Sequence, residues 1–151
     1  MMKTRRLGKT GLQVSEIGFG GEWLERHPEE EGIELIRYAS SKGINILDCW
    51  MADQKSRDVI GKGIHENRSE WFIQGHIGST WKEGQYYRTR DMQYVKPAFE
   101  DLLERLQTDY IDLGMIHYVD SEEEWAQIQH SDYLDYVMDL KKKGVIRHIG
   151  M

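Results

Sequence analysis

The chain has 151 residues, a formal net charge of −6, 39% hydrophobic residues and a single cysteine, Cys49. One cysteine excludes an intramolecular disulfide and a metal cage built from cysteines, and it suits a reducing cytoplasm. The longest uncharged stretches fall far short of the ~20 apolar residues that a membrane helix needs. The acidic balance argues against nucleic acid as the main partner. We therefore expect a cytoplasmic single-domain protein that has no nucleic-acid or membrane partner and that acts as an enzyme.

Apolar runs and stretches of helical periodicity alternate along the chain. Gly8 and Gly11 flank a short polar turn near the N-terminus, which predicts a β-hairpin. Apolar runs predict strands at 16–21, 43–48, 71–76, 110–117 and 145–151. Helical periodicity and capping residues predict helices at 28–42, 56–64, 91–106 and 131–143. A strand and a helix that repeat about every 30 residues are typical of a parallel sheet covered by helices.

Residues 78–90 form the longest stretch for which no regular structure is predicted. The stretch follows a strand, so we expect it at the carboxyl edge of the sheet, where such folds keep their sites. Arg88 and Arg90 within it are candidates to bind a phosphate or a carboxylate, although surface arginines are more often simply solvated. The acidic run 122–124 is expected to form the exposed first turn of a further helix, where the helix dipole favours negative charge.

Ionisable residues follow the apolar runs of three predicted strands. Asp48, His76 and His117 each end a strand, and the first strand of the sheet ends in two glycines. Because the carboxyl ends of parallel strands meet at one mouth, we expect these residues to lie together. Strand ends are often polar, so chance is the competing explanation. These side chains and Cys49 also carry metal-ligating atoms, but their spacing matches no closed motif and no metal is predicted.

The segments LGKTGLQVSEIGFG (7–20) and LQTDYIDLGMIHYVD (106–120) resemble the aldo-keto reductases, and the similarity extends over essentially the whole chain. The resemblance implies an α/β fold, the N-terminal half of a TIM (β/α)₈ barrel with an N-terminal β-hairpin. Such a barrel takes about 250 residues, so residues 1–151 are expected to form a single partial domain that ends after the fifth barrel strand. The most similar members are bacterial proteins with a cysteine-rich iron–sulfur extension, which these residues do not contain.

The resemblance also implies a catalytic set of Asp, Tyr, Lys and His. Asp48 matches the family's Asp and His117 matches its His. The segment DCWMADQKS places Asp53 where the family has its Tyr, and His76 stands where the family has its Lys. An aspartate is ionised near neutral pH and donates no proton unless burial or a second carboxylate keeps it neutral. His76 is the better candidate acid, because a nearby Asp48 carboxylate would favour its protonated form. The expected tetrad is thus a degenerate one.

Two further sets of residues are expected near the mouth of the sheet. Gly20 and Gly21 are expected to face the cofactor that the resemblance implies, NADP or NAD. Trp23, Trp50 and Tyr118 belong to a group of aromatic residues that either form a wall for the substrate or fill a half-solvated rim. The other members of this group are Trp81, Tyr86 and Tyr87.

Two functions from different classes stay open. The first is an oxidoreductase that passes hydride between NAD(P)H and a small-molecule carbonyl or alcohol. The family holds most of its cofactor with the second half of the barrel, so this chain alone is expected to bind NADPH weakly. The alternative is a non-catalytic truncated fragment or interaction module, whose exposed barrel edges pair in a homodimer. What the coding sequence specifies after Met151 would separate the two.

Overall fold

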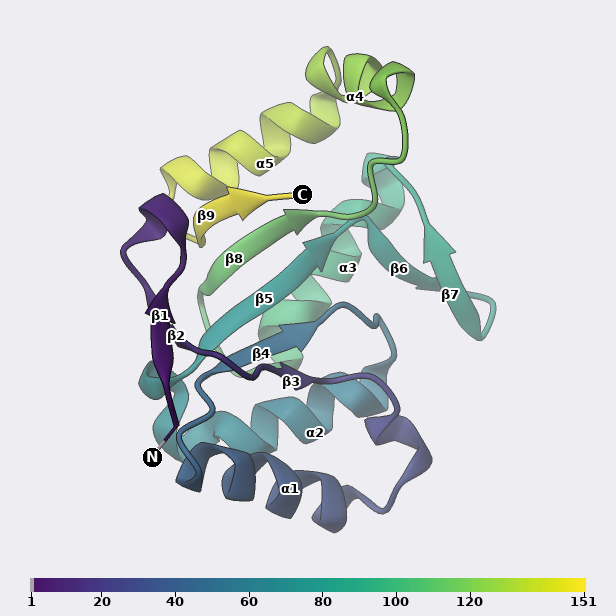
Figure 1. Cartoon of the computed structure of the whole chain (residues 1–151). Helices are drawn as coiled ribbons and strands as arrows, with labels where there is room; N and C mark the ends of the chain where they lie inside the picture. The colour runs from purple at the N-terminus through teal and green to yellow at the C-terminus, as the bar shows by residue number, and fades with distance from the viewer. Residues whose placement is uncertain (1) are drawn as a thin grey trace.

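The computed structural model describes residues 2–151 of the chain. Its centre is a parallel sheet of five strands in the order β3-β4-β5-β8-β9 (Figure 1). The strands are β3 (Phe19–Gly20), β4 (Ile46–Cys49), β5 (Phe72–Ile77), β8 (Ile111–Ile116) and β9 (Ile146–Gly150). Successive parallel strands lie side by side, as in the wall of a (β/α)₈ barrel. The predicted α/β class and the predicted parallel sheet are therefore confirmed.

Helices connect the strands and lie around the outer side of the curved sheet (Figure 1). They are α1 (Glu29–Ser41), α2 (Gln54–Ile64), α3 (Met92–Arg105), α4 (Glu122–Gln129) and α5 (Asp132–Lys142), and short 3₁₀ helices cover Gly8–Thr10, Leu24–Arg26 and His65–Glu70. No helix within residues 2–151 combines the length and the apolar composition that a bilayer span requires. The predicted helix at 56–64 begins earlier, because Asp53 and not Ser56 is its N-cap.

The core lies between the sheet and the helices. Its completely buried side chains include Ile36, Ile60, Ile73, Leu102 and Ile111. Two helices approach each other closely in this layer: a Cβ at Gly61 of α2 would lie 2.0 Å from the carbonyl oxygen of Arg105 at the end of α3. The absence of a side chain at Gly61 therefore sets the distance between α2 and α3.

Two antiparallel hairpins accompany the parallel sheet. The first pairs β1 (Thr4–Arg6) with β2 (Gln13–Ser15) and confirms the predicted N-terminal hairpin. The second pairs β6 (Ser79–Lys82) with β7 (Gln85–Arg88), in the stretch for which the sequence predicted no regular structure. Its two turn residues, Glu83 and Gly84, both have positive φ, as the tightest hairpin turns require. Glu-Gly is a weaker turn signal than Asn-Gly, which is why the sequence did not predict this hairpin.

Candidate active site

The carboxyl ends of β4, β5 and β8 bring three predicted residues together. Asp48 lies on β4 opposite Gln74 of β5, and His76 lies on β5 opposite Met115 of β8. His117 follows β8 directly and is 2% exposed. Its backbone N–H donates to the carbonyl of Ile77 at 3.1 Å, which continues the ladder between β5 and β8 by one residue. The three residues therefore lie together at one edge of the sheet, as the sequence predicted.

A continuous series of hydrogen bonds runs through these side chains. The Asp48 Oδ1 atom lies 3.0 Å from His76 Nε2, and it also accepts a 2.8 Å hydrogen bond from Gln74 Nε2. The Nδ1 atoms of His76 and His117 are 2.8 Å apart. On the far side of His117, its Nε2 atom lies 2.6 Å from the hydroxyl of Tyr86. We call this series, Asp48–His76–His117–Tyr86, the proton chain.

Burial keeps His117 and Tyr86, the last two members of the proton chain, uncharged. Desolvation, helped by the neighbouring His76, Arg90 and Arg88, lowers the pKa of His117 to about 4. Desolvation also raises the pKa of the Tyr86 phenol, as does the nearby Tyr118. At neutral pH, His117 is therefore a neutral imidazole and Tyr86 a protonated phenol.

Two of the three predicted substrate residues lie against the proton chain. The ring of Trp50 stacks on His117 with the centroids 6.0 Å apart, and it meets Tyr86 edge-on at 5.3 Å. The Tyr118 ring is 4.5 Å from His117, and its backbone φ of +46° is unusual for a tyrosine. Trp23 lies apart: it is half-exposed, and the Arg26 guanidinium covers its ring at 3.5 Å. Trp50 and Tyr118 thus frame the site, whereas Trp23 packs with its own 3₁₀ helix.

The two glycines at the end of the first barrel strand differ in role. A Cβ at Gly21 would lie 2.7 Å from Ile60 Cδ1 and 2.8 Å from the carbonyl oxygen of Asp48, so Gly21 is required for packing. Gly20 pairs with Asp48 in the sheet, and a Cβ added to it would have no heavy atom of the described residues within 4 Å. Gly20 therefore leaves an open backbone face beside Asp48.

Asp53, which the sequence predicted to stand where the family has its Tyr, caps the helix α2. Its carboxylate accepts a 2.9 Å hydrogen bond from the backbone N–H of Ser56 at the start of α2. Among the described residues, no hydrogen bond joins Asp53 to the proton chain. The neighbouring Cys49 is buried, and burial raises the pKa of its thiol to about 12, which keeps the sulfur protonated and unreactive.

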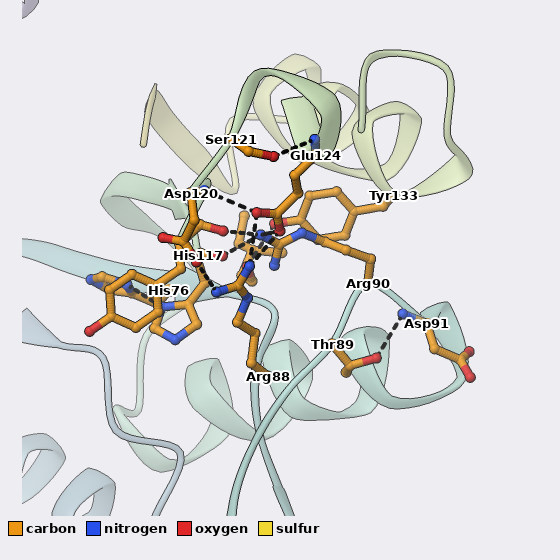
Figure 2. A network of polar contacts seen from close by, with 12 residues as sticks. His76, Arg88, Thr89, Arg90, Asp91, His117, Asp120, Ser121, Glu124 and Tyr133 are labelled. Atoms are coloured by element: carbon orange, nitrogen blue, oxygen red, sulfur yellow. Dashed lines mark hydrogen bonds and ion pairs between the residues drawn. The ribbon is translucent and has the colours of Figure 1, made fainter. Parts of the chain in front are cut away.

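Arg88, at the end of the second hairpin, binds two carboxylates of the chain itself. Its Nη2 atom contacts both oxygens of Glu124, at 2.7 and 2.8 Å, and its Nη1 atom contacts Asp120 at 2.5 Å (Figure 2). Glu124 comes from the first turn of α4, which the sequence predicted to be simply exposed. The expectation of a solvated Arg88 is wrong, because the fold supplies its carboxylate partners.

Arg90 extends the same cluster toward the site. It donates to the backbone carbonyl oxygens of His117 and Tyr118, and to Glu124 Oε1 at 3.3 Å (Figure 2). Its guanidinium also lies 5.0 Å from the centre of the Tyr133 ring. Arg88 and Arg90 together fasten the β6–β7 hairpin to the segment that follows β8, and this brings Tyr86 to His117.

Comparison of the sequence with known proteins identifies its family. Residues 16–151 match the Aldo/keto reductase family. The chain belongs to that family. It is 31% identical to the aldo-keto reductase YhdN of Bacillus subtilis over 159 residues, covering 99% of this chain and 46% of the relative. It is 29% identical to the uncharacterized oxidoreductase YqkF of the same organism over 154 residues, covering 99% and 48%.

A solved structure of an aldo-keto reductase has a similar fold. The aldo-keto reductase AKR11C1 from Bacillus halodurans, in its holo form, superimposes with a TM-score of 0.81 at 29% identity, covering 99% of this chain and 50% of that one. The chain spans about half the length of the curated relatives it matches. The predicted family and the predicted N-terminal half of a barrel are therefore confirmed.

Tyr86 is the functional candidate whose position the sequence did not predict. The sequence placed it only in a loose group of aromatic residues near the mouth. The segment TWKEGQYYR, with aromatic residues on both sides of Glu-Gly, is the signal that could have predicted the hairpin. Its contact with His117, 31 residues away, could not be read from any local pattern.

Proposed function

We propose that the protein containing this chain is a nicotinamide-dependent oxidoreductase that interconverts a small-molecule carbonyl and its alcohol in the cytoplasm. The observation that carries the proposal is the proton chain, which links Asp48, His76 and His117 at the carboxyl edge of the sheet. Aldo/keto reductase membership supports the reaction class. That Asp53 and His76 stand where the family has its Tyr and Lys is part of the proposal, and of these two only His76 belongs to the proton chain.

The cofactor, NADP or NAD, supplies or takes the hydride, so the residues of this chain only have to orient the substrate and manage one proton. Gly20 offers the open face beside Asp48 against which a nicotinamide ring would lie. Trp50 and Tyr118 flank His117 and would hold the apolar part of the substrate. His117, held neutral by burial, can accept a hydrogen bond or a proton without first losing one.

The test is a carbonyl panel with the complete natural gene product. We expect NADPH or NADH to be oxidised in the presence of some aldehydes or ketones, and His117→Ala to lower kcat/KM by roughly 100-fold or more. Thermal unfolding of both proteins checks that the variant is folded. Absence of any cofactor oxidation across the panel would reject the reaction class. Full activity in a folded His117→Ala variant would reject the site.

A second candidate function is an interaction module. In the described sheet, β3 and β9 are the outer strands, and each has a neighbour on one side only. Unpaired strand edges are templates for association, so two copies could pair through them in a homodimer. Light scattering on the 151-residue chain tests this: a folded, strictly monomeric species would reject the module. Titration of the same chain with NADPH tests the expected weak binding.

A further inference from the structure

The proton chain ends in a phenol that comes from outside the positions of the family's catalytic set. Asp53 occupies the position of the family's Tyr, and its carboxylate caps α2. Tyr86 comes from the β6–β7 hairpin, and its hydroxyl lies 2.6 Å from His117 Nε2. We propose that Tyr86 exchanges the proton with the substrate oxygen, and that His117 and His76 relay this proton to and from the carboxylate end at Asp48. This inference rests on the proposed function.

With both histidines neutral, one arrangement of hydrogens satisfies the contacts between successive members of the proton chain, and Gln74 Nε2, 3.4 Å from His76 Nε2, donates to Asp48 instead. An ionised Asp48 only accepts, so His76 Nε2 carries the hydrogen that it receives. In a neutral His76, Nδ1 is then an acceptor, and the 2.8 Å contact requires the hydrogen on His117 Nδ1. His117 Nε2 is in turn an acceptor, so the Tyr86 hydroxyl donates to it. The lone pairs of the Tyr86 oxygen are left for a substrate hydroxyl.

With the hydrogens arranged in this way, the proton chain can accept the proton that an alcohol loses on oxidation. The substrate hydroxyl gives its proton to the Tyr86 oxygen while the Tyr86 proton passes to His117 Nε2. The proton on His117 Nδ1 passes to His76 Nδ1, which leaves His76 as an imidazolium beside the Asp48 carboxylate. A bound oxidised nicotinamide would take the hydrogen and the electron pair of the substrate C–H bond as hydride, which balances formation of the C=O bond. Carbonyl reduction is the reverse, with the Tyr86 hydroxyl protonating the developing alkoxide.

The hairpin holds Tyr86 in place for this role. Tyr86 pairs with Trp81 across the hairpin, and the Thr80 hydroxyl donates to the carbonyl of Tyr87 at 2.6 Å. Successive side chains of a strand point to opposite faces. Tyr86 therefore meets His117, whereas Tyr87 packs against Tyr94 with the rings 5.8 Å apart. Tyr87 is thus a matched control: the same side chain on the same strand, on the other face.

A ligand-free measurement tests the relay directly. In protein labelled with ¹⁵N at histidine, NMR should find the hydrogen on Nδ1 of His117 and on Nε2 of His76. Tyr86→Phe removes the donor to His117 Nε2, so the ¹⁵N shift of this nitrogen should move, while Tyr87→Phe should leave it unchanged. A hydrogen on His117 Nε2 in the wild type, or an unmoved shift in Tyr86→Phe, would overturn the arrangement.

Activity provides the second measurement. With the complete gene product, Tyr86→Phe should lower kcat on the order of 10²- to 10⁴-fold with little change in KM, and Tyr87→Phe should stay within about twofold. An active wild type with an equally active Tyr86→Phe variant overturns the role of Tyr86 and leaves the proposed function standing. A wild type without activity overturns the proposed function, and with it the catalytic role of Tyr86, whatever the histidine tautomers are.

Discussion

The Nδ1 atoms of His76 and His117 lie 2.8 Å apart, so one ring donates a hydrogen and the other accepts it. Two imidazolium rings could not share this contact, because both nitrogens would carry a hydrogen. The structure favours a neutral His117, since burial and the facing cations Arg90 and Arg88 oppose its charge. The pair is therefore a contact that acid should break.

Acid should destabilise the fold through His117. Its pKa is about 4 in the folded chain and about 6.5 when unfolded, so the unfolded state binds more protons between these values. Stability is complete above pH 6.5 and falls toward pH 4. Relative to His117→Asn, the free energy of unfolding of the wild type should drop by about 3 kcal/mol between pH 7 and pH 4.

Urea unfolding at a series of pH values measures this difference. The variant His27→Asn is the control, because it makes the same substitution at an exposed histidine. The groups that face His117 are His76, Asp48, Tyr86, Arg88 and Arg90. Neither variant changes any of these residues. Parallel profiles for wild type and His117→Asn would contradict the prediction.

Asp53 should behave as a helix cap. Because its carboxylate accepts the Ser56 N–H, Asp53→Ala should lower the free energy of unfolding by about 1 kcal/mol, and Asp53→Asn, which can still accept, by less. Both variants should keep the carbonyl-dependent oxidation of NADPH or NADH. A folded Asp53→Asn variant that loses this activity would show that Asp53 has a catalytic role.

Glu124 should hold the β6–β7 hairpin in place. Glu124→Gln removes the charge that binds Arg88 with both oxygens and Arg90 with one. We expect a loss of about 1–3 kcal/mol in unfolding free energy and faster hydrogen exchange in β6 and β7. Glu122→Gln, on the exposed side of the same turn, is the control and should change neither. Equal effects of the two substitutions would show that the Arg88 contact is not what holds the hairpin.

Gly61 should tolerate no side chain. In Gly61→Ala, the new Cβ meets the carbonyl oxygen of Arg105, which is backbone and cannot rotate away. We expect a loss of at least about 2 kcal/mol in unfolding free energy, measured by urea unfolding. Gly20→Ala, with open space around its Cβ, should be close to neutral in the same experiment. A stable Gly61→Ala variant would mean that α2 and α3 separate at little cost.

The sequence by itself determined the fold class and three of the four members of the proton chain. Periodicity located the helices and strands, because burial of one face imposes a regular spacing on nearby residues. Asp48, His76 and His117 were found because each ends a strand, and parallel strands align their carboxyl ends whatever the details of packing. Asp91 and Ser131, with which two of the predicted helices begin, are N-caps in the structure, since a cap bonds within its own first turn.

Only the tertiary structure decided which side chains complete the site. The Tyr86–His117 contact spans 31 residues, and the Arg88–Glu124 contact spans 36. Both depend on how a hairpin folds back over the end of β8, which neither partner's neighbouring residues specify. The same holds for Asp53: the resemblance led us to expect it in the catalytic set, whereas its carboxylate caps a helix. Local patterns reflect local geometry, whereas a functional site is formed by contacts between elements that packing alone brings together.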